Sequence, residues 1–523
     1  MNFLRFYNTI KDYKAEQIRQ KFIYNLNKNY AQGGIQKNKK ACPEQVQPLH
    51  YSEPFQISAV FSKGQFKLMN AEYKFRNNPD WNHSENGKLW NLRLNSFDFL
   101  HQQGMDADSG LGLLKHFVSQ SKRIRSTYDS YCVSQRILNW LPFICAANSK
   151  DRQILAFVYN QARYLSANPE FHLRNNHLLD NAHALIRAGV YFRENKFVKR
   201  GTEILSAELP LQILSDGAHF ELSPMYHCIQ LRRILESIEL LRNYEFAHHR
   251  DLICLMESKA GIMCGWLLQM AFDNGELPQV NDSSSDMPNW LGLFQYAERL
   301  GIKTRLQHLG PSGFRKFRNR NFELLVDVNG LNPALAPGHS HADTFSFILN
   351  VFGEPFIVDT GVSTYERGAD RDYERSTLAH NTVIVAGKNQ SEVYDSFRVG
   401  FKNKVFGLKE NRNFVSASHD GYKSIGAIHS RSFEIKDREI IIRDIVDNVN
   451  SQSCIASFHV HKNSPLQQSG NGIIHKFVQI SFEGADSVQL SDTKISPAFG
   501  VKVPAKKVLV GFSGELITRI SLP

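Results

Sequence analysis

The chain has 523 residues, of which 42% are hydrophobic and 22% are charged, and these values exclude a disordered or fibrous protein. A chain of this length can bury more than one core, so two or three domains are expected. The net charge of +11 suits a polyanionic partner, either nucleic acid or an acidic polysaccharide, although a merely basic soluble surface would explain it as well. Because no run of about 18 apolar residues occurs, we expect no membrane span.

Cysteine usage and the first residues bear on the compartment. The seven cysteines form no C-x-x-C pair, and several lie in apolar helical segments, so we expect buried free thiols and a reducing compartment. Residues 1–20 contain no apolar core of signal-peptide length. A cytoplasmic location is therefore expected, with the periplasm as the alternative.

Residues 1–45 read as a basic N-terminal leader. The first 40 residues carry nine Lys or Arg against the two acids Asp12 and Glu16. They predict a helix followed by a loose tail. A solvated segment is the simplest interpretation, and a phosphate-rich or membrane surface is an alternative contact.

From about residue 80 to 305 the apolar residues recur with a helical period. The expected helices are 89–100, 130–144, 151–166, 175–192, 225–244 and 251–272. After about residue 312 the pattern changes to short alternating or β-branched runs, at 321–330, 344–353, 354–361, 381–387, 438–449, 455–461, 477–484 and 507–514. This order predicts a multidomain α+β protein, with a helical domain at 46–308 and an antiparallel sheet domain at 309–523.

The first motif is RNNHLLDNAHAL, residues 174–185. On a helix His177 and Asp180 share a face, so Asp180 could fix the tautomer of His177. Asn175 or Asn176 would supply a neutral amide donor. The alternative is an asparagine cap beside a histidine that has only a structural role.

The second motif is DGAHFELSPMYH, residues 216–227. Ser223 is a candidate N-cap and Pro224 fits the first helical position. Tyr226 then lies in the first turn, where the helix dipole and a nearby imidazolium would lower its pKa from about 10 and make it a usable base. The same loop holds several more ionisable side chains, namely Asp216, His219, Glu221 and His227.

The third motif spans residues 336–385. His339 and His341 are two apart, so on a strand they would point to one face, and Asp343 would continue it. Asp359 and His380 lie at the ends of later strands. Two histidines and an aspartate suit zinc, but their spacing matches no local metal motif, and a buried hydrogen-bond network is the alternative.

Two further polar segments lie beside these motifs. Residues 365–377 carry arginines, Arg375 among them, that could fork onto carboxylates or sulfates or pair with glutamates of the same loop. Asn281 and Asp282 lie in a polar loop and could line a cleft or cap a helix.

Together, NNHLLDNA, DGAHFELSPMYH, GHSHADTFSF and VDTG…RSTLAHNTV resemble the heparinase II/III family of polysaccharide lyases, which includes alginate lyases of similar architecture. The resemblance covers roughly residues 60–480. It implies an incomplete α/α toroid followed by an antiparallel β-sandwich. It also implies β-elimination at a uronic acid of an acidic polysaccharide, with no nucleic-acid partner.

The resemblance also implies residue roles. Tyr226 matches the tyrosine that takes the C5 proton, protonates the leaving oxygen, or does both. Asn176 and His177 match the residues beside the substrate carboxylate, and His339 matches a further active-site histidine. Zinc, as a structural brace, would bind His341, Asp359 and His380. The expected substrate contacts are Asn175, Asp180, His219, Glu221 and Arg375.

The sequence departs from this pattern in two places. First, Asp180 stands where relatives often have Glu. Second, the secretion signal of many relatives is not seen, and this second difference favours an intracellular intermediate or a surface polymer as the substrate. Two other functions stay open: a non-catalytic carbohydrate-binding or surface-polysaccharide assembly protein of the same fold, and a zinc-dependent hydrolase that activates a bound water.

Overall fold

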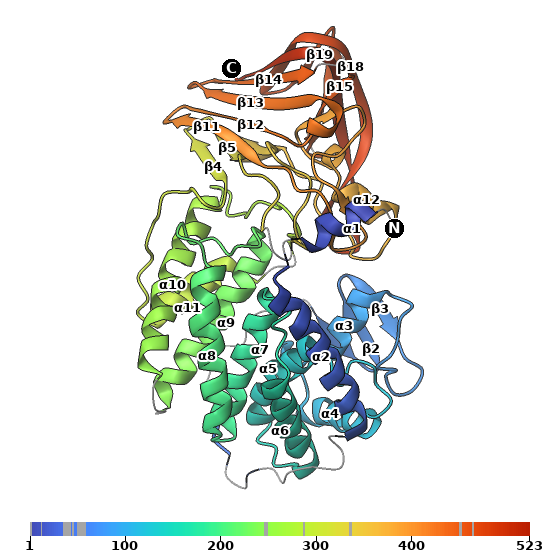
Figure 1. The fold of residues 1–523 in the computed structure, drawn as a ribbon, viewed down its shortest axis with the longest axis vertical. Coiled ribbons are helices and arrows are strands. Elements are labelled where there is room, and N and C mark those ends of the chain that lie inside the picture. Colours follow the sequence, from blue (N-terminus) through green and yellow to red (C-terminus); the bar gives the residue numbers. More distant parts are fainter. Residues whose placement is uncertain are drawn as a thin grey trace.

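The computed structural model describes residues 3–11, 13–34, 43, 46–49, 59–244, 249–285, 288–333, 337–448, 452–462 and 465–523. A helical domain and a sheet domain lie end to end along the long axis; α1 (Phe3–Ile10) lies beside the sheet domain, and the chain then forms the helical domain before it forms the sheet (Figure 1). This order confirms the predicted fold class of helices followed by an antiparallel sheet.

The helical region contains α1 (Phe3–Ile10), α2 (Ala15–Gly34), α3 (Lys88–Ser96), α4 (Ala107–Gln120), α5 (Ser130–Ala146), α6 (Arg152–Ala167), α7 (Asn176–Tyr191), α8 (Asn195–Gln212), α9 (Pro224–Asn243), α10 (Arg250–Met270) and α11 (Trp290–Arg299). A small sheet of β1 (Val60–Ser62), β2 (Gln65–Leu68) and β3 (Ala71–Lys74) precedes α3. The six predicted helices are present, but the first, predicted over 89–100, ends at Ser96, because Phe97 has a φ of 62°.

Helices α4, α8 and α11 were not predicted, and each contains a residue that disfavours helix in isolation. Gly110 lies in α4 and Pro210 in α8. Gly110 is required by packing, because a Cβ at this position would lie 2.2 Å from the ring of Phe143. Tertiary contacts therefore stabilise segments whose local propensity is poor.

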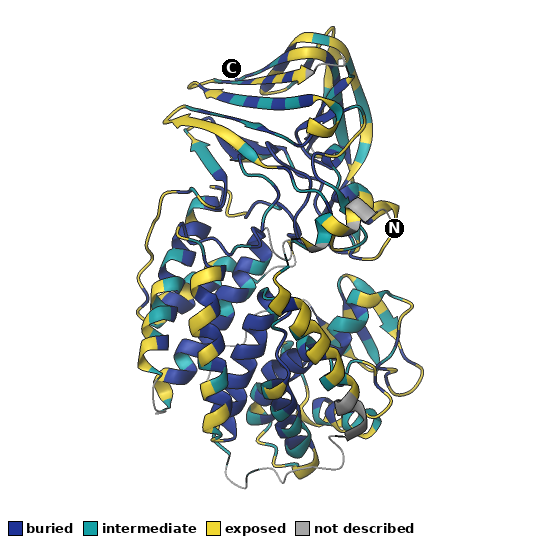
Figure 2. Ribbon diagram, in the orientation of Figure 1, coloured by how far each residue is buried: buried dark blue, intermediate teal, exposed yellow. Residues whose placement is uncertain are grey.

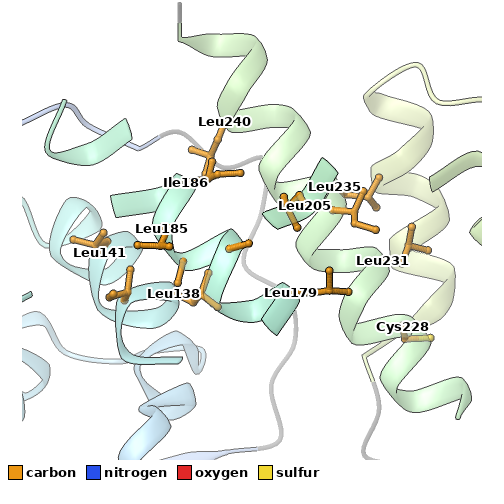
Figure 3. Close-up of a cluster of buried hydrophobic side chains, with 14 of the residues drawn as sticks. Leu138, Leu141, Leu179, Leu185, Ile186, Leu205, Cys228, Leu231, Leu235 and Leu240 are labelled. Carbon is orange, nitrogen blue, oxygen red and sulfur yellow. The ribbon is translucent and has the colours of Figure 1, made fainter. Parts of the chain in front are cut away.

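Helix α7 is the centre of the helical domain and is buried on nearly every side (Figure 2). It packs against α5, α8 and α9, and leucine and isoleucine side chains fill the space between them (Figure 3). A helix that is buried on nearly every side must be enclosed by others, and its polar residues then need partners inside the protein. Its polar side chains have specific partners: His183 contacts the Ser237 hydroxyl at 2.7 Å, and Arg187 donates to Glu236 at 2.6 Å.

Where the structure describes it, the N-terminal leader is largely exposed, as expected, but it also contacts both domains. In α1, Arg5 forms an ion pair with Glu392 at 2.6 Å, and Thr9 hydrogen-bonds Tyr394 at 2.7 Å, both in the sheet domain. Helix α2 contacts the helical domain at three places. Gln17 donates to the His172 carbonyl, the Tyr24 hydroxyl accepts from the Ser130 backbone N–H, and Lys28 donates to Asp129. Residues 3–34 therefore contact both domains. The predicted loose tail, 31–40, begins within α2, which continues to Gly34, so that part of the prediction is wrong; residues 35–40 lie outside the described residues.

The sheet domain is built from β4 (Phe314–Arg318), β5 (Phe322–Asp327), β6 (Phe347–Val351), β7 (Glu354–Ile357), β8 (Val383–Val385), β9 (Val393–Tyr394), β10 (Arg398–Val399), β11 (Val405–Asn411), β12 (Phe414–His419), β13 (Ala427–Ile435), β14 (Glu439–Asn448), β15 (Cys454–Val460), β16 (Gln467–Ser469), β17 (Gly472–His475), β18 (Val478–Ala498) and β19 (Val501–Ser521). Helix α12 (Ala369–Glu374) lies in the connection between β7 and β8.

Within the described residues, 14 of these strands form one antiparallel sheet that curls around an apolar core. Strand β19 pairs with β18 along one edge; on the other edge its first half pairs with β15 and its second half with β14. The 21-residue strand β19 thus joins the part of the sheet that contains β14 to the part that contains β15. The two layers expected of a sandwich are therefore continuous and form one curled sheet.

The described cysteines are free thiols. Cys132, Cys228, Cys264 and Cys454 are buried as expected, whereas Cys254 is exposed. No helix in the described ranges is long and apolar enough to span a bilayer.

Two glycines give a test of the packing between α7 and α8. A Cβ on Gly201 would lie 2.7 Å from the Ala182 carbonyl oxygen, whereas a Cβ on Gly112 would meet nothing within 4 Å. Gly201→Ala should lower the free energy of unfolding by about 1–3 kcal/mol through overpacking. Gly112→Ala should raise it by about 0.5–1 kcal/mol, since alanine is the better helix former. Urea unfolding measures both, and changes of the same sign would contradict this packing.

Candidate active site

Tyr226 lies in the first turn of α9, as the sequence predicts. The Ser223 hydroxyl oxygen accepts from the Tyr226 backbone N–H, and Pro224 occupies the first turn. The preceding Leu222 has a φ of 54°, a strained value for a leucine. This sharp turn lets the helix begin at the border of the sheet domain.

The phenol of Tyr226 meets His339 of the sheet domain. Their ring centroids are 4.0 Å apart, and the Tyr226 hydroxyl lies 3.2 Å from that of Tyr365. His339 is in a turn that precedes β6 rather than on a strand, so the predicted strand placement of His339 and His341 is wrong. The two histidines nevertheless converge, because both contact the same carboxylate.

That carboxylate is Asp282, which is fully buried. One oxygen accepts from His339 Nδ1 and the other from His341 Nε2, each at 2.9 Å. Arg371 forks onto both oxygens, at 2.5 and 2.8 Å. Although burial opposes its charge, Arg371 and the two histidines hold the pKa of Asp282 well below its usual range.

Ionisation of Asp282 fixes the histidine tautomers. An ionised carboxylate only accepts hydrogen bonds, so His339 must carry a proton on Nδ1 and His341 on Nε2. His339 in its neutral form then has its lone pair on Nε2. Burial lowers the pKa of His341 to about 4, so His341 is neutral, and its buried Nδ1 has no partner among the described residues.

The loop that carries Asp282 also joins the two domains. The Asn281 amide donates to the Leu222 carbonyl and accepts from the His341 backbone N–H, each at 3.1 Å. Ser223 donates to the Asp282 carbonyl at 2.9 Å. The loop therefore fixes the turn before Tyr226 relative to the turn that holds His339.

The start of α7 forms the second wall. Asn175 is the N-cap, and its side chain accepts from the His177 N–H at 3.1 Å, which agrees with the cap interpretation of this residue. The His177 ring stacks on Tyr131, with centroids 4.1 Å apart, and its Nδ1 lies 3.5 Å from Glu170. The neighbouring Asn176 is buried, and its side-chain oxygen has no partner within the described part of the chain.

The expected pairing of Asp180 with His177 is replaced by another. Asp180 accepts from the amides of Gln135 and Gln230, at 2.8 and 3.2 Å, and the ion-pair partner of His177 is Glu170. Burial lowers the pKa of His177, but Glu170, followed by Asp180 and Glu221, outweighs burial and raises it above its ordinary value.

His219 and Glu221 are buried between the two walls, with His219 Nδ1 3.8 Å from Glu221 Oε2. Both nitrogens of His219 and one oxygen of Glu221 have no hydrogen-bond partner among the described residues. Burial raises the pKa of Glu221, against the opposing influence of His339 and His177. These unpaired polar atoms mark a place where a polar ligand would be favoured.

Two nearby residues have structural roles. His227 stacks on Trp266, its Nε2 bonds the Met263 carbonyl, and its Nδ1 accepts from the His219 N–H. Arg375 is buried and donates to the backbone carbonyls of Ser340, Tyr394, Asp395 and Arg398. The geometry places Arg375 behind the site, where it holds the His339 turn against the β9–β10 hairpin.

The expected lowering of the Tyr226 pKa is not found. Burial raises this pKa and outweighs the opposing effects of Tyr365 and Arg93. The helix N-terminus therefore does not make Tyr226 a phenolate at neutral pH, and the hydroxyl keeps its proton.

The side chains expected to hold zinc lie together but do not converge as three ligands. Asp359 accepts from His380 Nδ1 at 2.7 Å, and the His380 ring is 5.2 Å from that of His341. No group of three His, Cys, Asp or Glu among the described residues is arranged to hold a metal ion. As placed, the three side chains do not form a three-ligand centre, and no step of the reaction is assigned to zinc.

Sequence comparisons agree with this geometry. Residues 117–299 match the model described as heparinase II/III N-terminus, and residues 302–522 match heparinase II/III-like, C-terminal. The chain belongs to the heparinase II/III family. It is 24% identical over 346 residues to a heparin-sulfate lyase of Bacteroides stercoris, a match covering 61% of this chain and 50% of the relative.

A second heparin-sulfate lyase, from Pedobacter heparinus, is 26% identical over 271 residues, covering 45% of this chain and 40% of the relative. The chain thus matches half or less of the length of these two members of the family. Among solved structures, heparinase III has a TM-score of 0.70 at 18% identity, covering 86% of this chain and 80% of that chain. A heparan sulfate lyase from Pedobacter heparinus has a TM-score of 0.56 at 15% identity, covering 94% and 88%. These two structures share the fold.

Sequence reasoning did not assign several residues that organise the site. Asp282 was considered only as a cleft or cap residue, and Arg371 only as one of a run of arginines. Tyr131 and Glu170 carried no local signal, because each lies more than five residues from His177 in the chain. The arginines that follow Tyr365 in the sequence were the signal that could have indicated Arg371 as the partner of a buried carboxylate.

Asp282→Asn tests the buried carboxylate. It should lower the free energy of unfolding by about 3–5 kcal/mol at pH 7, because Arg371 would be buried without an opposite charge. Since the folded-state pKa is depressed, this stabilisation is complete above the unfolded value of about 3.9 and is lost as pH falls toward the folded value.

The gap between wild type and the variant in urea midpoint should therefore narrow from pH 5 to pH 3. The exposed Asp273→Asn is the control, with an expected change below about 1 kcal/mol. A gap that stays constant with pH would contradict the ionised state of Asp282.

The zinc site stays a prediction, and metal analysis tests it. If the site binds zinc, mass spectrometry should find one zinc per chain, and chelation should lower the melting temperature. His380→Ala should lose the metal. Zinc-free protein with a melting temperature insensitive to chelator would reject it.

Proposed function

We propose that the protein is a lyase that cleaves an acidic polysaccharide by β-elimination at a uronic acid. The observation that carries this proposal is the contact of Tyr226 with His339 across the domain border, 4.0 Å between ring centroids. A proton donor from one domain and a proton acceptor from the other meet there, and Asn176 and His177 form the second wall.

His339 is the base in this proposal. Its Nδ1–H is held by ionised Asp282, so neutral His339 offers Nε2 to the C5 proton of the uronate. The electrons of that C–H bond form the C4–C5 double bond as the C4–O bond breaks. Asp282 orients the ring and stabilises the imidazolium that forms.

Tyr226 is the acid. Its raised pKa keeps the phenol protonated at neutral pH, so it can give its proton to the leaving glycosidic oxygen. One proton is taken at C5 and one is supplied to the leaving oxygen; no water is added. This assignment selects one of the tyrosine roles that the family resemblance left open.

In this proposal Asn176 and His177 make the weakly acidic C5 proton easier to remove. The side-chain amide nitrogen of Asn176 can donate a hydrogen bond to the adjacent carboxylate, and the imidazole of His177, whose pKa is raised, can neutralise it, so that both stabilise the enolate-like transition state. The nearby Glu221, whose pKa burial raises, could donate to the same sugar when protonated.

For the substrate class we propose a glycosaminoglycan of the heparan sulfate type. The two relatives reported above are named heparin-sulfate lyases, and a net charge of +11 suits a polyanionic chain.

Substitutions of the two proposed groups test the reaction. Tyr226→Phe and His339→Gln should each reduce the rate of unsaturated-product absorbance on heparan sulfate by about 10²–10⁴-fold. The exposed Tyr7→Phe should leave it unchanged. Turnover close to wild type in either variant would reject that residue's role, and absence of product from wild type across uronate polymers would reject the function.

The pH profile distinguishes the assigned roles. With Tyr226 as a protonated acid and His177 as a cation, kcat/KM should show no rise between pH 9 and 10, because burial raises the pKa of the phenol and loss of the His177 proton can only lower the rate. A rate that keeps rising through pH 9–10 would instead indicate that the phenolate is the base.

A further inference from the structure

Helix α3 begins at the edge of the site, held by a residue of the sheet domain. Glu366 accepts from the backbone N–H groups of Lys88 and Leu89, at 2.6 and 3.4 Å. Glu366 follows Tyr365, whose hydroxyl contacts that of Tyr226. The first turn of α3 is therefore fixed relative to the proposed acid, although α3 lies far from both motifs in the sequence.

The packing of α3 shows which face points toward the site. Leu89 packs against a small cluster at the domain border, and Tyr226 packs against the same cluster, which consists of Met225, Val362, Tyr365 and Phe499. Arg93 is four residues after Leu89, so it lies one turn further along the same helix face. This face carries Arg93 along the helical wall next to Tyr226.

The guanidinium of Arg93 is only partly used by the protein. Its hydrogen bond among the described residues is to Asp98, at 3.2 Å, and its Nε has no acceptor there. The side chain keeps 29% of its surface exposed. A guanidinium has five N–H donors in a fixed fork; Nε is buried, and of the two terminal nitrogens only one has an acceptor among the described residues.

The electrostatics agree with this position. Burial opposes the charge of Arg93, but Asp98, followed by Tyr131 and Tyr226, raises its pKa, so the side chain stays cationic. Tyr131 stacks on His177 and Tyr226 on His339. Arg93 is thus near the aromatic partners of both histidines.

We propose that Arg93 is a substrate-binding residue that takes an acidic group, a carboxylate or a sulfate, of the sugar bound next to Tyr226. The proposal rests on the function proposed above and specifies how the anionic substrate is recognised. A planar fork with unused donors suits either oxyanion, and the partly buried position strengthens the attraction.

A binding experiment tests Arg93 without requiring turnover. In the Tyr226→Phe background, the Kd for a heparan sulfate oligosaccharide is measured by calorimetry for Arg93, Arg93→Lys and Arg93→Met. Arg93→Met should weaken binding at least about tenfold and reduce its salt dependence; Arg93→Lys should recover part of the loss. The exposed Arg412→Met, in the β11–β12 turn, is the control and should bind as the parent does.

Folding is checked separately. Asp98 keeps its hydrogen bond from Asn139 at 2.8 Å when Arg93 is replaced, so the melting temperature of Arg93→Met should stay near that of the parent. If Arg93→Met were to melt early, Arg93→Lys on its own would decide the proposal, because it keeps the charge but loses the fork.

Two modified oligosaccharides separate the anions. If the penalty of Arg93→Met disappears on a desulfated oligosaccharide, the group is a sulfate; if it disappears on a carboxyl-reduced one, the group is a carboxylate. Equal Kd values for Arg93, Arg93→Lys and Arg93→Met on the unmodified oligosaccharide would overturn the proposal. Failure of wild type to form unsaturated product bears on the lyase function alone.

Discussion

The buried carboxylate of Asp282 is the interaction on which the site depends. It lies in the loop between α10 and α11 of the helical half and receives hydrogen bonds from three side chains of the sheet half, Arg371, His339 and His341. A buried charge is tolerable only when every lone pair is occupied and an opposite charge is adjacent. The two domains must therefore meet in one arrangement, and that arrangement brings Tyr226 onto His339.

Burial also decides the protonation states. Tyr226 keeps its proton, and His341 is neutral although it touches a carboxylate, because desolvation outweighs the attraction. The pKa of His177 is instead raised, because Glu170 and two further carboxylates lie near it and outweigh desolvation. The site therefore contains a protonated phenol, an oriented imidazole and an imidazole whose pKa is raised, which are the groups that proton transfer beside a carboxylate requires.

The sequence was informative where the signal is local. Ser223 and Pro224 marked the start of α9, Asn175 marked the start of α7, and apolar periods located six helices and the main strands. The sequence was uninformative where packing overrides propensity. In α4, for example, Gly110 leaves room for the ring of Phe143, which a larger side chain would contact too closely. The sequence also misplaced partners across distance: Asp180 was paired with His177 because they are three residues apart, whereas Glu170 occupies that position in space.

The sequence by itself determined the order of the two domains, the family, and the residue types present at each wall of the site, because caps, periodicity and motif spacing act within a few residues. Only the tertiary structure decided which carboxylate orients which histidine, that the sheet is one curled surface, and that the phenol stays protonated. Those properties depend on desolvation and on contacts between residues 57 to 139 positions apart, such as Asp282 with His339 and Tyr226 with Tyr365, and no local pattern in the sequence records them.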